Sequence, residues 1–321
     1  MHMNFLLLAS TAMTVLAHPG HHEPETHATI QRRGHLGRRC ADHVATFNKR
    51  RMNKRSLTKR WEGNHNTTFE IQTEAPFYEN IQNDTCVLAP EVTRGPYVWP
   101  RSQTLRQDMT EDQIGIPLWL DIGVLDMNTC EPLPNALVDF WHCNATGSYS
   151  SFTGLSPNTP FEELLSSMDI SDFEIGVTDL HTDDSTWLRG MWPTDVHGMM
   201  EMKTIFPGFY VERAIHIHAQ VHTDWTTREN GTIVASNTVS TGQLYFAEEL
   251  EEKIMALEPY VSHTQINRTT NAKDTVISGG FEDGYSPIIS VVPADGKDVK
   301  NGMIGYITIG VDTSAIENFK K

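Results

Sequence analysis

Residues 116–142 have the sequence IPLWLDIGVLDMNTCEPLPNALVDFWH, and this stretch decides the fold class. Its two ends, 116–125 and 136–142, are rich in Leu, Ile, Val, Trp and Phe, which favour β-strands. The residues between them, 126–135, are rich in Asp, Asn and Pro and predict a loop. The stretch therefore predicts two strands joined by a connection of turn-forming residues.

The same pattern recurs outward from this stretch. Further strands are predicted at residues 198–206, 214–222, 232–236 and 304–311. Only two helices are expected in this part of the chain, a short one near 161–168 and one at 244–257. Many short strands with few helices predict a mainly β protein. We expect a two-sheet β-sandwich core with a basic N-terminal helical segment and a few short helices.

Charge is divided unevenly along the 321 residues, which carry 25 Lys and Arg against 41 Asp and Glu, a net charge of −16. Residues 18–60 hold 11 basic and 3 acidic side chains, about +8, so residues 61–321 carry about −24. A body this acidic repels phosphate groups, so a nucleic-acid partner is not expected.

The chain is expected to have three parts. Residues 1–17 form a short apolar run that ends in Val15-Leu16-Ala17, which predicts a secretory signal removed after Ala17 and hence an extracellular protein. The run is shorter than the roughly 20 residues of a membrane span, and no later segment reaches that length, so no membrane partner is expected. Residues 18–75 form a basic segment, and residues 76–321 form the sandwich domain.

The basic segment is expected to contain an amphipathic helix over residues 36–55. Its apolar side chains recur at helical spacing: Leu36, Cys40, Val44 and Phe47. The pair Lys59-Arg60 resembles the processing site of a Golgi endoprotease, which would make the segment up to Arg60 a propeptide. The alternative is a solvated basic helix that lies against the acidic body, and the sequence leaves both interpretations open.

Secretion predicts oxidised cysteines and glycosylated loops. The chain has four cysteines, which allow three pairings: Cys40, Cys86, Cys130 and Cys143. A zinc site is the other interpretation, but the cysteines lack CxxC spacing and the compartment disfavours free thiolates, so disulfides are expected. Five glycosylation sequons are present, at Asn66, Asn83, Asn144, Asn230 and Asn267.

Residues 158–186 differ in character from the rest of the domain. They contain eight Asp and Glu and no Lys or Arg, with few secondary-structure signals. A long loop of this kind is either a functional lid or a plain surface insertion. We expect a lid, because the segment lies between the two groups of candidate site residues described next.

The strongest chemical signal is His216-Ile217-His218 in a predicted strand. Side chains at positions i and i+2 of a strand share a face, so both imidazoles can contact one metal ion. Tyr210 stands shortly before them after a Pro-Gly turn, and Tyr149 follows the strand that ends near His142. Taken alone, two histidines at this spacing and a tyrosine at a strand end are each more often structural than metal-binding.

Several ordered motifs over roughly residues 80–260 resemble the intradiol ring-cleavage dioxygenases, and in particular their secreted fungal branch. The motifs are residues 130–150 with Tyr149, Trp187-Leu-Arg-Gly190, Thr204-Ile-Phe-Pro-Gly-Phe-Tyr210, Arg213-Ala-Ile-His-Ile-His218, Cys86-Val-Leu-Ala-Pro-Glu91, Gly95-Pro-Tyr97 and Gly242-Gln-Leu-Tyr-Phe246. In this family two tyrosinates and two histidines hold a non-haem ferric ion. The resemblance therefore implies Fe(III) bound by Tyr149, Tyr210, His216 and His218.

The resemblance also implies a reaction and further site residues. A catecholic substrate and O₂ would be the small-molecule partners, and the product would be a muconate-type diacid. Tyr210 would leave the iron and take a substrate proton, and Arg213 would stabilise charge that develops on the ring. The alternative for Arg213 is a surface ion pair with Glu212 or a nearby acid. Gln243 matches a family glutamine near the substrate, and its alternative role is hydrogen bonding at a helix N-terminus.

The other histidines and the other candidate functions have simpler interpretations. His222, His142 and His197 are expected to be structural. A cupin-type site also uses two histidines at this spacing, but the glutamate that it needs a few residues later is absent. The remaining alternatives are a secreted β-sandwich binding module without catalysis and a tailoring dioxygenase of secondary metabolism. The oligomeric state is left open.

Overall fold

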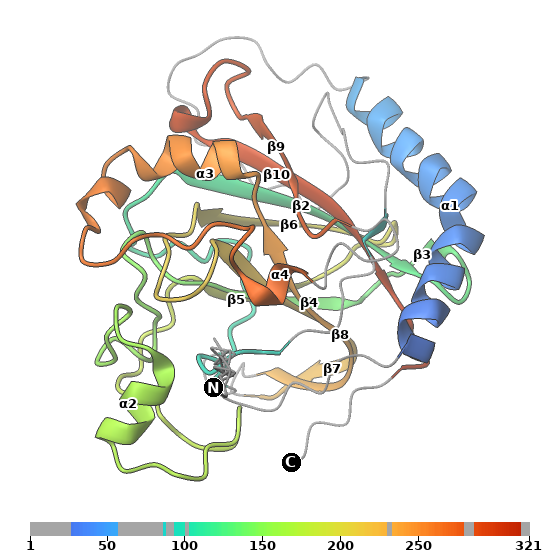
Figure 1. The fold of residues 1–321 in the computed structure, drawn as a ribbon. Coiled ribbons are helices and arrows are strands. Elements are labelled where there is room, and N and C mark those ends of the chain that lie inside the picture. The colour runs from blue at the N-terminus through green and yellow to red at the C-terminus, as the bar shows by residue number, and fades with distance from the viewer. Residues whose placement is uncertain are drawn as a thin grey trace, which may run out of the picture.

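The computed structural model describes residues 27–56, 86–87, 93–99, 103–229, 233–278 and 286–315. Two β-sheets form its centre (Figure 1). The first sheet contains β1 (Cys86–Val87), β10 (Met303–Val311), β2 (Pro117–Asp126) and β3 (Glu131–Pro132) in that order, with β6 (Met199–Ile205) against β2 and β9 (Ser290–Pro293) against β10. The second has the order β5 (Arg189–Pro193), β4 (Leu137–Trp141), β7 (His216–Thr227) and β8 (Ile233–Tyr245). The predicted mainly β sandwich is confirmed.

Alternating apolar side chains of both sheets meet in one core. In β2 the inward residues are Leu118, Leu120, Ile122 and Val124, each fully buried. In β7 they are Ile217, Ala219 and Val221, which share the same core cluster. Because side chains alternate along a strand, the remaining residues of β7 face away from this core. The outer face of the second sheet therefore receives the polar side chains of β7.

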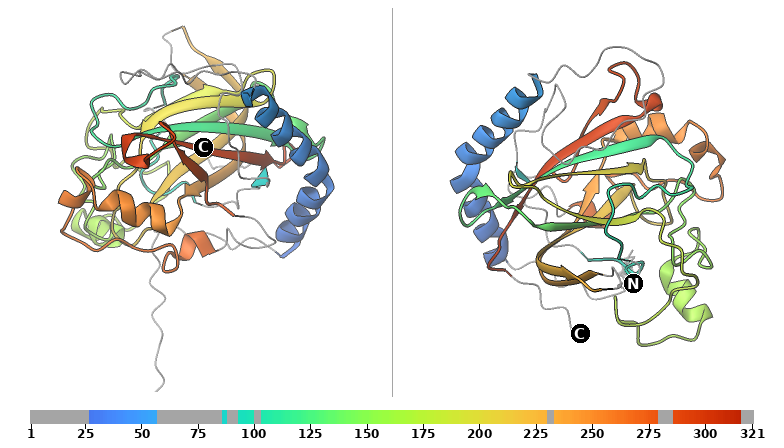
Figure 2. Two further views of the ribbon diagram at one scale, coloured as in Figure 1. Left: turned by 90° about the horizontal axis from the view of Figure 1, so that it is seen from above. Right: turned by 180° about the vertical axis from the view of Figure 1, so that it is seen from behind.

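Short helices surround the sandwich. They are α2 (Phe161–Ser167), α3 (Glu248–Met255), α4 (Thr275–Ser278) and the 3₁₀ turns η2 (Tyr260–Ser262) and η4 (Val299–Asn301). Helix α1 (His27–Ser56) and helix α2 lie at opposite sides of the molecule in both views of Figure 2. Within the part of the chain that the structure describes, no helix has the length and hydropathy to cross a membrane.

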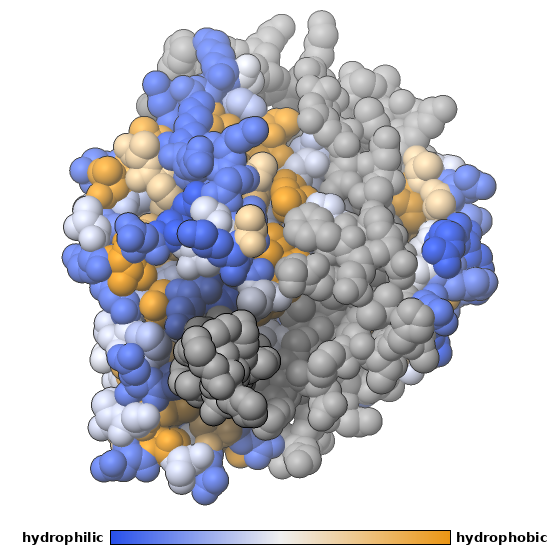
Figure 3. All heavy atoms as spheres, in the orientation of Figure 1, coloured by the Kyte–Doolittle hydropathy of each residue, from blue (hydrophilic) through white to orange (hydrophobic). Residues whose placement is uncertain are grey.

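Helix α1 packs against the rim of the first sheet. Its apolar face, predicted from Leu36, Cys40, Val44 and Phe47, is buried, and these four side chains cluster with Leu125, Met127, Cys130 and Met199. Burial of an aliphatic or aromatic side chain of this size contributes roughly 1.5–3 kcal/mol, so the packing alone favours docking. The outward edge of α1 is hydrophilic (Figure 3).

Covalent and polar contacts also hold α1 in place. A disulfide joins Cys40 to Cys130, which selects one partner for Cys40 from the pairings that the sequence left open. Arg39 donates to the carbonyl oxygens of Met127 and Asn128, and Arg32 forms an ion pair of 2.6 Å with Asp312. The interpretation of α1 as a helix that lies against the acidic body is therefore supported. The processing site Lys59-Arg60 lies outside the described residues.

Two predicted helices have different bounds. The N-terminal helix begins nine residues before the predicted 36–55. The predicted helix 244–257 was wrong at its start, because β8 continues through Tyr245 and α3 begins only at Glu248. Leu244 points into the core while Gln243 and Tyr245 point outward, and Ala247 has extended backbone angles. Pairing of these residues with β7 overrides their helical composition.

Candidate metal centre

His216 and His218 lie on the outer face of the second sheet, as the strand pattern predicted. Both side chains are buried, and their Nε2 atoms are 3.1 Å apart. The Nδ1 atom of His216 lies 2.7 Å from the carbonyl oxygen of Ala214. Since a carbonyl only accepts, Nδ1 carries the proton and the Nε2 lone pair points toward His218. This tautomer is the one required of a metal ligand.

Tyr210 reaches the same point from the loop between β6 and β7. Its hydroxyl oxygen is 3.3 Å from Nε2 of His216. Gly208 lets this loop cross the loop that carries Tyr149, because a Cβ at Gly208 would lie only 2.4 Å from the carbonyl oxygen of Ala145. The Gly208 amide donates to the carbonyl of Asn144 at 3.1 Å. Close backbone contact therefore sets one tyrosine loop against the other.

Tyr149 completes the group. Its ring centroid is 5.6 Å from that of Tyr210 and 6.2 Å from that of His218. Tyr97 stacks on the Tyr149 ring at 4.5 Å and meets the Tyr210 ring edge-on at 5.8 Å. The Tyr149 hydroxyl is buried and has no hydrogen-bond partner among the residues that the structure describes. An unsatisfied buried hydroxyl is costly, and a metal ion would satisfy it.

The four candidate ligands provide two imidazole nitrogens and two phenol oxygens. The part of the chain described by the structure contains no group of three or more His, Cys, Asp or Glu placed to hold a metal, so a metal here depends on the tyrosines. Burial raises the pKa of Tyr210 to about 12, although Arg213 acts against this rise, and raises the pKa of Tyr149 well above its ordinary value. Burial, with help from Arg213, lowers the pKa of His216 well below its usual range. Without a cation, Tyr149, Tyr210 and His216 are therefore neutral.

Arg213 lies beside this group and is fully buried. Its Nε donates to Asp274 at 2.9 Å and both side chains are fully buried, so Arg213 does pair with an acid but the alternative of a surface ion pair is wrong. Its Nη2 donates to Oε1 of Gln243 at 2.5 Å and to the Tyr245 hydroxyl at 3.0 Å.

Gln243 and Tyr245 come from β8, where they stand directly opposite His218 and His216 in the strand register. The alternative of Gln243 at a helix N-terminus is therefore also wrong. Gln243 was predicted from its motif. The roles of Tyr245 and Asp274 were missed. Alternation along β8 could have found Tyr245 once Gln243 was placed, but no local pattern marks Asp274.

Arg189 fixes the backbone beneath Tyr149. Its Nε donates to Oγ of Ser150 at 2.9 Å, and its Nη2 donates to the carbonyl oxygens of Ser150 and Tyr97, each at 2.8 Å. Burial lowers the pKa of Arg189 to about 10, while Tyr149, Asp139 and Asp183 act in the opposite direction. Arg189 therefore holds both stacked tyrosines, Tyr97 and Tyr149, from one point.

The acidic segment 158–186 covers the tyrosines. Phe161, Leu165 and Leu180 from this segment belong to the same buried cluster as Tyr149 and Tyr210. The start of the segment is also joined to the Tyr210 loop. The Val211 amide donates to the carbonyl of Pro157, and Pro157 directly precedes the segment. The segment is thus a packed wall of the candidate site rather than a remote insertion.

The remaining histidines have structural contacts. His142 lies 2.7 Å from both the Cys143 carbonyl and the Thr204 hydroxyl, and His222 pairs with Thr238 at 3.0 Å beyond a bulge in β7. His197 is exposed in a turn. Cys143 is a buried free thiol.

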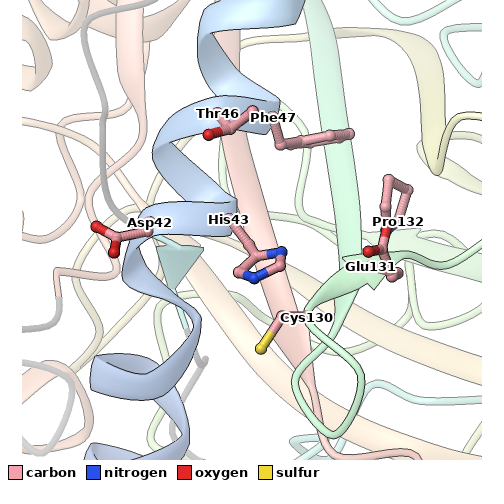
Figure 4. A pocket seen from close by; sticks show the side chains of 7 residues that line it. All are labelled: Asp42, His43, Thr46, Phe47, Cys130, Glu131 and Pro132. Atoms are coloured by element: carbon pink, nitrogen blue, oxygen red, sulfur yellow. The ribbon is translucent and has the colours of Figure 1, made fainter.

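A separate cavity of about 320 Å³ lies between α1 and β3, lined by Asp42, His43, Thr46, Phe47, Cys130, Glu131 and Pro132. Figure 4 shows His43 pointing from α1 toward Cys130, with Glu131 and Pro132 on the facing strand. None of these residues belongs to the candidate metal centre. The cavity marks the junction of α1 with the sandwich.

Comparison with known proteins agrees with this arrangement. The family model described as Dioxygenase matches residues 94–174. A solved intradiol ring-cleavage dioxygenase from Tetranychus urticae is 26% identical, with 73% of this chain and 98% of that chain covered and a TM-score of 0.56. A second solved dioxygenase has the same identity and coverage and a TM-score of 0.55. No curated protein matches the chain.

The family model and the two solved structures are therefore similar to this chain in sequence over part of its length and in fold. The resemblance to the intradiol ring-cleavage dioxygenases and the prediction that the chain is an enzyme are thereby confirmed.

Proposed function

We propose that the protein is an extracellular, non-haem Fe(III) dioxygenase that cleaves catechols or hydroxyquinols between their two hydroxylated carbons. The observation that carries this proposal is the convergence of Tyr149, Tyr210, His216 and His218 on one buried point. The resemblance described above supports the choice of reaction.

The donor set fits a ferric ion. Phenolates are hard anionic donors that favour Fe(III) over Fe(II), and the unsatisfied Tyr149 hydroxyl and the aligned His216 nitrogen are the features expected of ligands. When bound, the iron would act as a Lewis acid that binds the two substrate oxygens and activates the ring toward O₂.

Tyr210 is suited to accept a substrate proton. A catechol must lose two protons to bind as a dianion. Because burial raises the pKa of Tyr210 to about 12, a Tyr210 phenolate that no cation holds binds a proton strongly at Oη. Tyr210 also lies beside both His216 and the buried Arg213, so the accepted proton stays within the site.

Arg213 provides a fixed positive charge where negative charge develops on the ring. Its guanidinium stays protonated, because Tyr245, Asp274 and Tyr210 raise its pKa even though burial alone would lower it. The aromatic wall formed by Tyr97 and Phe161 with the acidic segment excludes water from the ligands. Both oxygen atoms of O₂ would end in the two carboxyl groups of the product.

Purified protein tests this function directly. We expect one iron per chain, a burgundy colour from charge transfer between tyrosinate and iron, and incorporation of labelled O₂ into both carboxyl groups of a muconate-type product. A protein that stays colourless and iron-free after ferric reconstitution would contradict the proposal. Iron binding without turnover on a panel of catechols would favour the binding module, and turnover of only one specialised catechol would favour a tailoring enzyme.

The extracellular location is part of the proposal. The Cys40–Cys130 disulfide supports it, because such bonds persist in oxidising compartments.

Two of the five sequons differ in how free the asparagine side chain is. Asn267 is exposed, whereas the Asn144 side chain donates to Gln113 and accepts from the Thr146 and Ser148 amides. We expect glycopeptide mass spectrometry of the secreted protein to find a glycan on Asn267 and none on Asn144. A mature N-terminus at His18 or Trp61 would distinguish signal removal alone from further processing.

A further inference from the structure

Arg213 needs a partner that holds its charge. A fully buried guanidinium is stable only when its charge is paired and its donors are satisfied. The motif that contains Arg213 has no acidic residue on the same side, and neighbouring Glu212 faces the acidic residues Glu162 and Glu163 instead. The partner therefore has to come from elsewhere in the chain.

Asp274 is this partner, 61 residues further along the chain. Its Oδ2 accepts from Nε of Arg213 at 2.9 Å and from the amide of Ala214 at 2.8 Å. Its Oδ1 accepts from the amides of Val276 at 2.7 Å and Ile277 at 3.3 Å, at the start of α4. Both oxygens are thus fixed by backbone donors, so the carboxylate has little freedom to move.

The other end of the guanidinium is fixed from β8. Nη2 of Arg213 donates to Gln243 and to Tyr245, and the Tyr245 hydroxyl donates to Gln243 at 2.7 Å. Arg213 is therefore held between α4 and the strand that lies opposite His216 and His218. Rotation of the guanidinium would break contacts on both sides.

We propose that Asp274 is a positioning residue for the dioxygenase reaction, which fixes Arg213 in the orientation needed to stabilise charge on the substrate ring. This inference rests on the proposed function. Asp274 contacts none of the four candidate ligands; it acts on the site through Arg213 and through the amide of Ala214, the residue whose carbonyl oxygen contacts His216. A variant that keeps its iron therefore reports on Arg213. Displacement of a catalytic charge by about 1 Å is enough to lower a rate about 100-fold.

The test compares Asp274→Asn with wild type. An asparagine has the size of the aspartate, but one of its two oxygen acceptors is replaced by an NH₂ donor. This donor would face another donor, either Nε of Arg213 or a backbone amide. We expect kcat/KM to fall about 100-fold. We also expect the fall to be in kcat, with the iron content, the charge-transfer band and the affinity for the inert probe 4-nitrocatechol close to wild type. In an Arg213→Gln background, Asp274→Asn is expected to cause no further fall.

A purely structural role predicts different results. Glu251→Gln is the matched control, because Glu251 is also a fully buried acidic side chain that contacts an arginine, but this arginine is Arg268 and not Arg213. It is expected to lower the thermal midpoint without a selective fall in kcat. Equal kinetic losses in both variants, loss of iron in Asp274→Asn, or an additional fall in the Arg213→Gln background would overturn the proposal.

Two further measurements keep the inference testable. If Asp274→Asn does not fold, Asp274→Glu keeps the charge and displaces the guanidinium by one methylene, and wild-type kcat in that variant would overturn the inference. In metal-free full-length protein, the ¹H–¹⁵N NMR signal of Arg213 Nε–H, identified by its loss in Arg213→Lys, is expected to shift in the Asp274 variant. This readout does not require turnover, so it separates failure of this inference from failure of the proposed function.

Discussion

The candidate site has two halves that are built differently. One half comes from paired strands, where His216 and His218 of β7 face Tyr245 and Gln243 of β8. The other half comes from loops, where Tyr149 and Tyr210 are set by crossing backbones and aromatic packing. In the strand half the ladder register fixes the positions of the side chains. In the loop half the positions of the two tyrosines depend on the close backbone contact at Gly208 and on packing against the acidic segment 158–186.

Removal of a strand ligand is expected to have the largest effect. In His218→Ala the remaining donors include only one imidazole, and Trp141 loses the ring that stacks on it at 4.8 Å. Loss of a contact that only supports a ligand costs about 10–100-fold in metal affinity, so loss of the ligand itself should exceed this. Iron analysis and turnover measure the effect, and an iron-loaded, active His218→Ala protein would remove His218 from the ligand set.

The two loop tyrosines are expected to respond differently. In the proposed mechanism Tyr149 is a ligand that stays on the iron, so iron and colour should decrease together in Tyr149→Phe. Tyr210 is the proposed acceptor of the substrate proton. Such proton transfer typically contributes about 10²–10⁴-fold to a rate, so in Tyr210→Phe turnover should fall more than iron content does. Optical spectra with iron analysis and steady-state kinetics distinguish the two. Identical behaviour of both variants would mean that the tyrosines share one role.

Gly208→Ala breaks the loop half without removing any ligand. The added methyl group would lie within 2.6 Å of the backbone of Asn144 and Ala145, so the two loops must move apart. We expect a stability loss of about 1–3 kcal/mol and an iron affinity lowered by about 10–100-fold. Chemical denaturation and iron titration measure these changes. In the control Gly296→Ala the added atom meets nothing within 4 Å and only the positive φ of 67° strains the backbone, so stability should fall while iron affinity stays unchanged. Unchanged iron affinity in Gly208→Ala would show that the loop crossing does not position Tyr210.

The smallest expected effect is the contribution of His142, which lies next to the loop half, to the loss of folding stability at acid pH. Burial lowers the pKa of His142 to about 4, so the folded protein keeps it neutral while the unfolded chain takes up a proton below about pH 6.5. His142 therefore lowers stability as the pH falls from about 6.5 toward 4, by at most about 1.4 kcal/mol per pH unit.

His142→Gln isolates this contribution, since its amide can replace the contacts to Cys143 and Thr204. Burial raises the pKa of Asp139 to about 7 and of Glu251 to about 9, so these groups act in the opposite direction in wild type and variant alike. Denaturation of metal-free protein at pH 7 and pH 5 should show a smaller acid loss in the variant. An equal loss in both proteins would contradict this assignment.

The contrast between the halves also explains what the sequence could predict. The period of two along a strand is local, so the face shared by His216 and His218 was predictable from three residues. Tyr149 and Tyr210 were located by motif resemblance, because no local rule says that two loops cross at Gly208. Asp274 was missed because its role comes from a long-range contact to Arg213. The helix expected at 244–257 failed at its start because pairing with β7 extends the strand through Tyr245.

The Cys40–Cys130 disulfide changes what a cut after Arg60 would produce. It joins α1 to the loop before β3 across 90 residues, so peptide-bond cleavage between them would not release the helix. The product would be a two-chain molecule, with a short basic light chain and an acidic heavy chain that separate only on reduction. Its net charge would stay near −16 instead of becoming about −24. Cys40 would then remain paired, and the two chains would appear as one band on a non-reducing gel and as two after treatment with thiol.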